Sequence, residues 1–413
     1  MIRVEGGHPL RGRVRAAGAK NAALPALLAS LLTDQPVRLE RIPRIADVET
    51  TIDLIHALGK RVDWKDGVAE VHGDGELWAR APREPVQRMR ASFIALGPLL
   101  ARCGEAWMPL PGGCAIGPRP VDLHLYGLSR LGARIEFTDG LVYARARRLR
   151  GATVWLDYPS VGATEHLLLT GALAEGTTTI INPAREPEVV DLGRLLEQMG
   201  ARVRWAADRV SIEGQPELGG ACHDLLPDRI EAGTYLIAGV LTGGETTVTG
   251  VVPEHLQALV EKLKDAGASV ELGEQEITAR RGEALRAVDV TTWPYPGFPT
   301  DLQAPLMALL CCAEGESHVR ETVFASRWGH VPPLQAMGAS ISIRDDTATI
   351  RGVKKLHGAE VVASDLRAGA ALVLAALGAA GTTRIGGEEH LARGYESFLN
   401  KVTALGAKAW EET

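Results

Sequence analysis

The stretch MGARVRW, residues 199–205, recurs in related form along the whole chain. The other copies read LGKRVDW (58–64), LGARIEF (131–137), AGASVEL (266–272), MGASISI (337–343) and LGAKAW (405–410). We expect a helix to end at each glycine, because glycine tolerates the left-handed backbone that closes helices, and the alternating residues behind it indicate a half-buried strand. The glycines recur about every 70 residues, so the sequence predicts six copies of one structural unit.

Each unit also holds a second, more uniformly apolar helix. These helices are expected near residues 22–32, 91–101, 164–174, 232–241, 302–312 and 368–377. A helix that is apolar on nearly every face must be buried on nearly every face. The sequence therefore predicts an α/β fold with buried helices inside and mixed sheets outside, three units to a domain. Neither a GxGxxG nor a GxxxxGK[ST] fingerprint follows any expected strand, which disfavours nucleotide-cofactor enzymes.

A chain of 413 residues is too long for one ordinary core, so two domains are expected. We predict a first three-unit domain over residues 21–228, and a second over 229–413 together with 1–20. The division falls near Asp228, between the third and fourth units. An expected strand at about residues 10–17 does not fit the first unit by length, and we assign it to the sixth.

The composition indicates a soluble globular protein, with 46% apolar and 23% charged residues. A formal charge of −6 argues against general nucleic-acid binding, so an anionic ligand would need local arginines. The five cysteines are odd in number and lack metal-ligand spacing, which predicts a reducing compartment, no disulfides and no metal. The segment MIRVEGGHPL contains no hydrophobic signal region, and the longest uncharged run, 368–383, is too short for a membrane span. We expect a cytoplasmic protein with no membrane partner.

The segment PGGCAIGPRPVDLH (111–124) places Cys114 on a glycine-rich loop ahead of an expected helix start. Glycines let the backbone approach a ligand closely, and helix N–H groups favour an anion. Arg119 adds a charged donor that favours the thiolate. The segment therefore suits a reactive cysteine, and a cysteine in an ordinary surface turn is the alternative.

Charged residues gather at the expected helix starts. They are Lys20-Asn21, Asp47, Arg90, Arg119, 160–164, 185–188, Asp228-Arg229, Thr300-Asp301, 324–327, 365–367 and 390–393. A cation at a helix N-terminus opposes the helix dipole, so we expect an anionic ligand there. If equivalent helix ends lie on equivalent faces, these residues meet in a cleft between the domains. Capping and surface pairing are the alternative.

Asp301 follows Pro296, Gly297 and Pro299 at a helix start, where a carboxylate can be a cap or a general base. His124, His330 and His390 fit structural roles better than catalytic ones. Histidine pairs with zinc spacing are missing from the sequence, so no metal is predicted.

These motifs together resemble the UDP-N-acetylglucosamine 1-carboxyvinyltransferases, within the EPSP synthase-like family. The resemblance covers essentially the whole chain, through AGAKNAALP (17–25), MRASFIALGP (89–98), PGGCAIGPRPVDLH (111–124), PSVGAT (159–164), REPEVVD (185–191), LPDRIEAGT (226–234), PGFPTDLQ (296–303), DLRA (365–368) and RGYE (393–396). It implies a pair of inside-out α/β barrels. It also implies transfer of the enolpyruvyl group of phosphoenolpyruvate to the 3′-hydroxyl of UDP-N-acetylglucosamine, with release of phosphate, as the first committed step of peptidoglycan synthesis.

The resemblance also assigns residues. Cys114 would be the proton donor and site of a covalent adduct and the target of fosfomycin, Asp301 would accept the proton of the sugar hydroxyl, and Lys20 would join them as a catalytic residue. The implied phosphoenolpyruvate ligands are Lys20, Asn21, Arg90, Arg119, Arg367 and Arg393. Those of the nucleotide sugar are Asn21, Arg90, Arg119, Pro120, Val121, Asp122, Leu123, Ser160, Val161, Gly162, Asp301, Val323 and Arg327. No cofactor is implied, and the oligomeric state stays open.

Tyr158 departs from the family pattern, since some members carry a lysine there. Three alternatives remain: the sister enzyme acting on shikimate 3-phosphate, an RNA 3′-phosphate cyclase, and a non-catalytic paralogue that binds nucleotide sugar. The cysteine loop and AGAKN disfavour the first, the net charge disfavours the second, and Cys114 with Asp301 disfavours the third.

Overall fold

The computed structural model describes residues 1–73, 75–112 and 121–412. By internal packing the described chain divides into two compact units. The N-unit comprises the described residues of 18–112 and 121–226, and the C-unit comprises 1–17 and 227–412. Each unit has its own apolar core.

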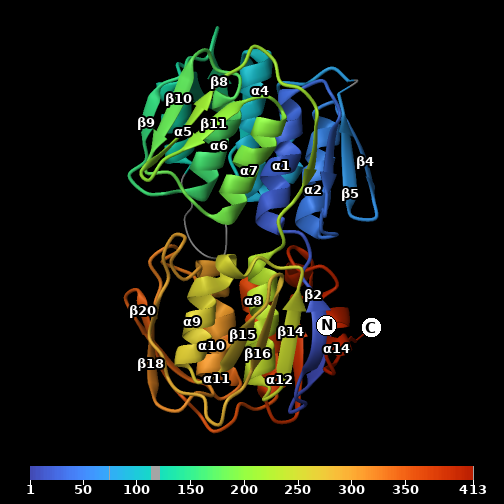
Figure 1. The fold of residues 1–413 in the computed structure, drawn as a ribbon, viewed down its shortest axis with the longest axis vertical. Helices are drawn as coiled ribbons and strands as arrows, with labels where there is room; N and C mark the ends of the chain where they lie inside the picture. Colours follow the sequence, from blue (N-terminus) through green and yellow to red (C-terminus); the bar gives the residue numbers. More distant parts are fainter. Residues whose placement is uncertain (74, 113–120, 413) are drawn as a thin grey trace. The chain divides into compact units, whose positions relative to one another are not determined.

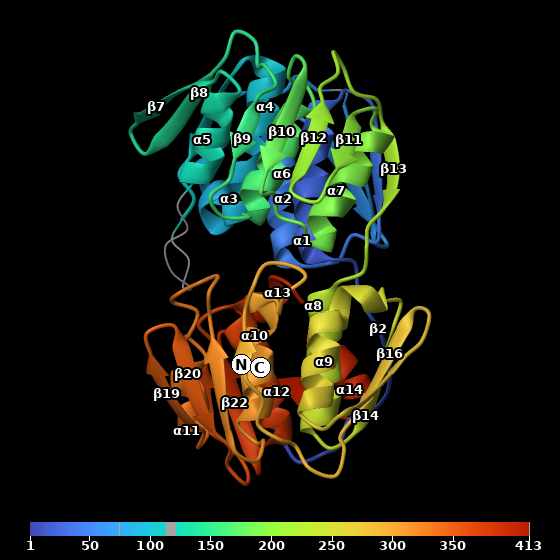
Figure 2. The same ribbon diagram turned by 60° about the vertical axis from the view of Figure 1, so that its left-hand side comes forward.

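In the N-unit three sheets surround the helices, in the strand orders β13-β3-β5-β4, β6-β8-β7 and β9-β10-β12-β11. Figure 2 shows the last of these sheets with its strands in that order. The strands are β3 (Val37–Glu40), β4 (Arg61–Lys65), β5 (Val68–His72), β6 (Glu105–Pro109), β7 (Arg134–Thr138), β8 (Leu141–Arg145), β9 (Thr153–Trp155), β10 (Thr177–Ile181), β11 (Arg202–Trp205), β12 (Arg209–Glu213) and β13 (Ala221–Asp224). The helices are α1 (Lys20–Ala29), η1 (Ser30–Leu32), α2 (Ala46–Ala57), α3 (Arg83–Arg88), η2 (Arg90–Ala95), α4 (Leu96–Cys103), α5 (Asp122–Arg130), α6 (Val161–Gly171) and α7 (Pro187–Gln198).

The C-unit repeats this plan, with the strand orders β2-β14-β16-β15, β17-β18-β20-β19 and β21-β22-β1-β23. Its strands are β1 (Ile2–Glu5), β2 (Arg11–Arg15), β14 (Glu245–Thr249), β15 (Ser269–Leu272), β16 (Glu276–Arg280), β17 (Val290–Thr291), β18 (Glu316–Arg320), β19 (Ser340–Arg344), β20 (Thr347–Arg351), β21 (Glu360–Val362), β22 (Thr382–Gly386) and β23 (Lys408–Glu411). The helices are α8 (Arg229–Leu241), η3 (Pro253–Leu256), α9 (Gln257–Asp265), η4 (Thr300–Leu302), α10 (Gln303–Leu310), α11 (Val331–Ala336), α12 (Leu366–Gly378), α13 (Glu389–Ala392) and α14 (Phe398–Ala404).

The apolar helices form the centre of each unit. Every residue of α8 and α10 is buried, and so is almost all of α12, which packs against both. In the N-unit the buried helix α6 packs against α4. The outer helices α7 and α9 instead bury one face and keep a polar side. The predicted fold class, with buried helices inside and mixed sheets outside, is confirmed for each unit.

The six repeat glycines end helices as predicted. Their φ angles lie between 91° and 106°, in the left-handed region that residues with a side chain rarely adopt. The next residues then enter strands β4, β7, β11, β15, β19 and β23. One short motif therefore defines the same helix-to-strand turn in all six units.

The assignment of residues 10–17 to the sixth unit is wrong. Strand β2 pairs in parallel with β14, in the fourth unit. The sixth unit is completed by β1, which lies antiparallel between β22 and β23 and buries Ile2 and Val4. Figure 1 shows the dark-blue strand β2 beside β14. Only four residues long, β1 gave no separate signal in the sequence.

Within the described part of the chain, none of the helices has the length and apolar character needed to cross a membrane.

Candidate active site

In the C-unit, Asp301 lies between two arginines. Its Oδ1 is 2.8 Å from Arg327 Nη2, and its Oδ2 is 2.7 Å from Arg367 Nη2. Both arginine side chains are buried, whereas the side chain of Asp301 is 22% exposed. Arg367 belongs to the first turn of α12, and the short helix η4 carries Asp301 into α10. Two helix starts and one loop thus form a carboxylate–diarginine cluster: Asp301, Arg327 and Arg367.

This cluster fixes the charge of Asp301. Burial by itself would raise the pKa of the carboxyl, but Arg367 and Arg327 outweigh burial and hold it well below its usual range. The carboxylate is therefore ionised but a weak base in this arrangement. Neither η4 nor α10 has a side-chain N-cap, so the alternative in which Asp301 only caps a helix is not supported.

Hydrogen bonds extend from the cluster to Val323. Arg327 Nη1 donates to Thr300 Oγ1 over 2.8 Å, and the Thr300 hydroxyl donates to Glu321 Oε2 over 2.9 Å. The other Glu321 oxygen accepts the backbone N–H of Val323 at 2.8 Å and that of Phe324 at 2.9 Å. Glu321 therefore holds the 323–327 loop against Asp301. Sequence reasoning missed this residue, because glutamate is not among the residue types that mark turns.

Arg367 is also held from its other side. Its guanidinium lies 5.4 Å from the centre of the Tyr395 ring, and the Tyr395 hydroxyl is 3.0 Å from Thr234 Oγ1. Two buried donors, Arg327 Nε and Arg367 Nη1, have no hydrogen-bond partner among the described residues. The cluster thus retains unused donor capacity for an anion.

Arg393 is half-buried and terminates the short helix α13 as its C-cap. The prediction that residues 390–393 stand at a helix start holds for His390, in the first turn of α13, but not for Arg393, which lies at the end of that helix; the next helix, α14, begins at Phe398. A cation at a helix C-terminus is favoured by the dipole, so the position of Arg393 needs no anionic ligand to explain it.

In the N-unit, Lys20 begins α1 and is buried. Its Nζ is 2.6 Å from Asp47 Oδ2, in the first turn of α2. The sequence led us to expect a ligand anion beside this cation, whereas the structure supplies a carboxylate of the chain itself. Asn21 follows Lys20 in the first turn of α1.

Two stretches of the N-unit that are assigned to the nucleotide sugar lie close together. Val121 is the N-cap of α5, and Asp122 and Leu123 are in its first turn. Ser160 caps α6 by accepting the N–H of Ala163 at 3.3 Å, and Val161 and Gly162 follow. A Cβ at Gly162 would lie 3.1 Å from the His124 ring, so the two helix starts pack closely. Arg90 is at the start of η2, and its charge helps to lower the pKa of His124.

Cys114, Arg119 and Pro120 lie outside the described residues. No group of described histidine, cysteine, aspartate or glutamate side chains could hold a metal ion.

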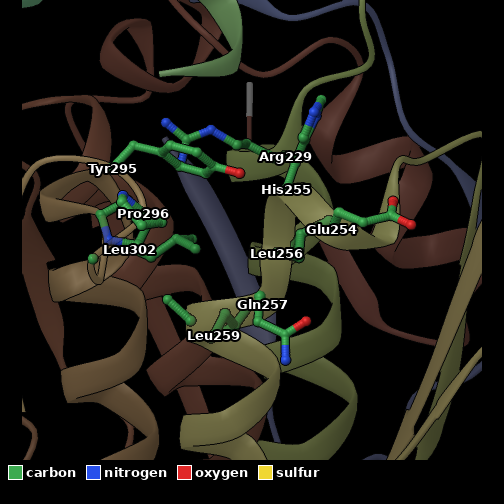
Figure 3. Close-up of a pocket in the computed structure, with 12 residues that line it drawn as sticks. Arg229, Glu254, His255, Leu256, Gln257, Leu259, Tyr295, Pro296 and Leu302 are labelled. Atoms are coloured by element: carbon green, nitrogen blue, oxygen red, sulfur yellow. The ribbon is translucent and has the colours of Figure 1, made fainter. Parts of the chain in front are cut away.

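A hollow in the C-unit lies beside the segment that carries Asp301. Figure 3 shows Arg229 along the Tyr295 ring, 5.6 Å from its centre, with Pro296 and Leu302 nearby. Of the charged residues predicted at helix starts, Arg229 lines this hollow. The residues assigned to the two substrates do not, so the carboxylate–diarginine cluster remains the candidate site of the C-unit.

Comparison with known proteins decides the family. A sequence profile of EPSP synthase (3-phosphoshikimate 1-carboxyvinyltransferase) matches residues 4–402. The chain belongs to the EPSP synthase family.

The similar curated proteins are more specific. The UDP-N-acetylglucosamine 1-carboxyvinyltransferase 2 of Carboxydothermus hydrogenoformans is 50% identical over 408 residues, covering 98% of this chain and 97% of that protein. The UDP-N-acetylglucosamine 1-carboxyvinyltransferase of Nitratidesulfovibrio vulgaris is 49% identical over 411 residues, covering 99% and 98%. The resemblance drawn from the motifs is confirmed.

Among solved structures, the enolpyruvyl transferase NikO from Streptomyces tendae matches with a TM-score of 0.91 and 30% identity, over 99% of this chain and 98% of that one. An EPSP synthase from Acinetobacter baumannii matches with a TM-score of 0.75 and 19% identity over the full length of both chains, which supports the fold alone.

Proposed function

We propose that this chain transfers the enolpyruvyl group of phosphoenolpyruvate to the 3′-hydroxyl of UDP-N-acetylglucosamine and releases phosphate, the step that commits the sugar to peptidoglycan. The observation that carries the proposal is the 50% identity, over 98% of the chain, to a relative named UDP-N-acetylglucosamine 1-carboxyvinyltransferase 2. The nine motifs that carry the resemblance include both Cys114 and Asp301.

The reaction is an addition followed by an elimination. The sugar oxygen bonds to C2 of phosphoenolpyruvate while the methylene carbon takes a proton, and loss of phosphate with one proton of the new methyl group restores the double bond. Such a reaction needs an acid, a base and a cationic setting for the phosphate and carboxylate. We propose Cys114 as the acid and Asp301 as the base.

The proposed phosphoenolpyruvate ligands are Lys20, Asn21, Arg90 and Arg119 from one part of the chain and Arg367 and Arg393 from the other. Those of the nucleotide sugar are Asn21, Arg90, Arg119 to Leu123, Ser160 to Gly162, Asp301, Val323 and Arg327. In this scheme, a substrate anion that binds Arg327 or Arg367 weakens the ion pair of that arginine with Asp301. Its pKa then rises toward the range in which a carboxylate can accept the hydroxyl proton.

We also propose that the protein acts in the cytoplasm. The four described cysteines, Cys103, Cys222, Cys311 and Cys312, are free thiols, which suits a reducing compartment.

The test is phosphate release with phosphoenolpyruvate and each of two acceptors. We expect release with UDP-N-acetylglucosamine and none with shikimate 3-phosphate. Release with shikimate 3-phosphate alone would assign the chain to the sister reaction. Binding of UDP-N-acetylglucosamine without turnover would indicate a non-catalytic paralogue.

A further inference from the structure

Two buried histidines of the N-unit share a hydrogen bond. His124 Nδ1 is 2.9 Å from His166 Nδ1, and both rings are buried. Phe93 packs edge-on against them, with ring centres 5.7 Å from His124 and 6.2 Å from His166. A bond between two Nδ1 atoms requires that one ring carries its proton on Nδ1 and the other on Nε2.

Both rings are neutral. Burial, helped by the charge of Arg90, lowers the pKa of His124 to about 3, and burial together with His124 lowers the pKa of His166 well below its ordinary value. The pair therefore keeps one shared proton throughout the neutral pH range.

The pair joins the segments assigned to the nucleotide sugar. His124 directly follows residues 121–123 in α5, and its ring packs against Gly162, two residues after the N-cap of α6. His166 lies in α6, and Phe93 belongs to η2, which begins at Arg90.

The ring of His166 packs closely against α4. A Cβ at Gly97 of α4 would approach its Nε2 to 2.7 Å. Only a residue without a side chain fits there, so α4 and α6 pack closely at His166. The Nε2 atom has no hydrogen-bond partner among the described residues, so the bond to His124 is what orients the ring.

We propose that His166 is a positioning residue whose hydrogen bond to His124 sets the spacing between the first turns of α5 and α6, and with it the binding of the nucleotide sugar. This inference rests on the proposed function. Helix starts offer N–H groups to anions, and two of them at a fixed spacing suit a ligand with two linked phosphates, such as a nucleoside diphosphate sugar. The pair touches no reacting atom and therefore acts through the two helices.

The test compares His166→Leu with His166→Asn. Leucine fills the space but leaves a buried Nδ1 of His124 unpaired, whereas an amide can still donate or accept. We expect His166→Leu to raise both the Kd and the KM for UDP-N-acetylglucosamine about tenfold, with kcat and the KM for phosphoenolpyruvate nearly unchanged. We expect His166→Asn to restore most of the affinity.

Thr170→Val is the matched control. It removes a buried hydroxyl one turn further along α6, whose hydrogen bond goes to the backbone oxygen of His166, and should leave both KM values unchanged. Equal changes in the two KM values of His166→Leu, or none, would overturn the inference. Phosphate release by the unmodified protein separately tests the proposed function.

A spectroscopic measurement keeps the inference testable even if His166→Leu does not fold. The ¹⁵N spectrum of the unmodified protein should show one of the two rings as the Nδ1–H tautomer. Two Nε2–H rings would leave no donor between the facing atoms and would refute the proposed bond.

Discussion

Replacing Asp301 by asparagine should separate the charge of this residue from its shape. The amide keeps the size of the side chain but can accept a hydrogen bond from only one of the arginines, at present 2.8 and 2.7 Å away, and turns its NH₂ group toward the other. Breaking a buried ion pair costs about 3–5 kcal/mol. Because Asp301 retains 22% exposure, we reduce this figure to about 2–3 kcal/mol.

That loss should lower the Tm of the protein by roughly 4–12 °C. Turnover should fall by about 10²–10⁴-fold, since the proposed general base is lost. Inorganic phosphate should raise the Tm of Asp301→Asn more than that of the unmodified protein, because the two arginines then lack a carboxylate and bind the anion more readily. Differential scanning fluorimetry across a phosphate series and a phosphate-free coupled assay measure these effects.

Glu231→Gln is the matched control. Glu231 forms a buried pair with Lys401 at 2.6 Å in the same unit, outside the proposed site. The Glu231→Gln variant should lose stability to a similar extent but keep its turnover, and phosphate should raise its Tm no more than that of the unmodified protein. Near-normal turnover of Asp301→Asn, or equal phosphate responses of all three proteins, would refute the reasoning.

Three further predictions follow from the remaining parts of the chain. Deleting residues 1–7 removes β1 from the middle of its sheet, so calorimetry should show a destabilised C-unit; an unchanged transition would contradict the observed pairing. Fosfomycin, which imitates phosphoenolpyruvate, should label Cys114. Cys311 should stay unlabelled, because burial raises the pKa of its thiol. Peptide mass mapping identifies the labelled cysteine. Burial lowers the pKa of His124 to about 3 and that of His330 to about 4. As the pH falls below about 6.5, these two histidines therefore become protonated only in the unfolded chain. Each of them then lowers the free energy of unfolding by about 1.4 kcal/mol per pH unit. Neither ring should titrate by NMR between pH 7 and 5, and a titrating signal would contradict the shift.

The sequence predicted the repeat because each unit must end a helix and start a strand within a few residues. Only glycine adopts the required left-handed backbone at low cost, so the signal survives in all six copies. The strands at the N-terminus were harder to assign. Strand β1 lies between β22 and β23, nearly 400 residues away in sequence, and the pairing of such distant segments leaves no local pattern.

The candidate site was predictable in its residue types but not in its pairing. Motifs identified Asp301, Arg327 and Arg367, yet nothing in their spacing showed that one carboxylate lies between both arginines. The same holds for Lys20 and Asp47, whose ion pair depends on how α1 and α2 pack. His166 was missed because an apolar helix hides a single buried histidine, and only the contact with His124 gives it a role.

The paired cations have a consequence for the binding of anions. At the starts of α1 and α12, a basic residue that would oppose the helix dipole is held by a carboxylate of the chain: Lys20 by Asp47, and Arg367 by Asp301. When an entering anion replaces such an ion pair, its net gain is only a difference between two similar interactions. A ligand with a single anionic group gains little from such an exchange. Within the C-unit, an anion can instead use the two buried donors that have no partner among the described residues, Arg327 Nε and Arg367 Nη1.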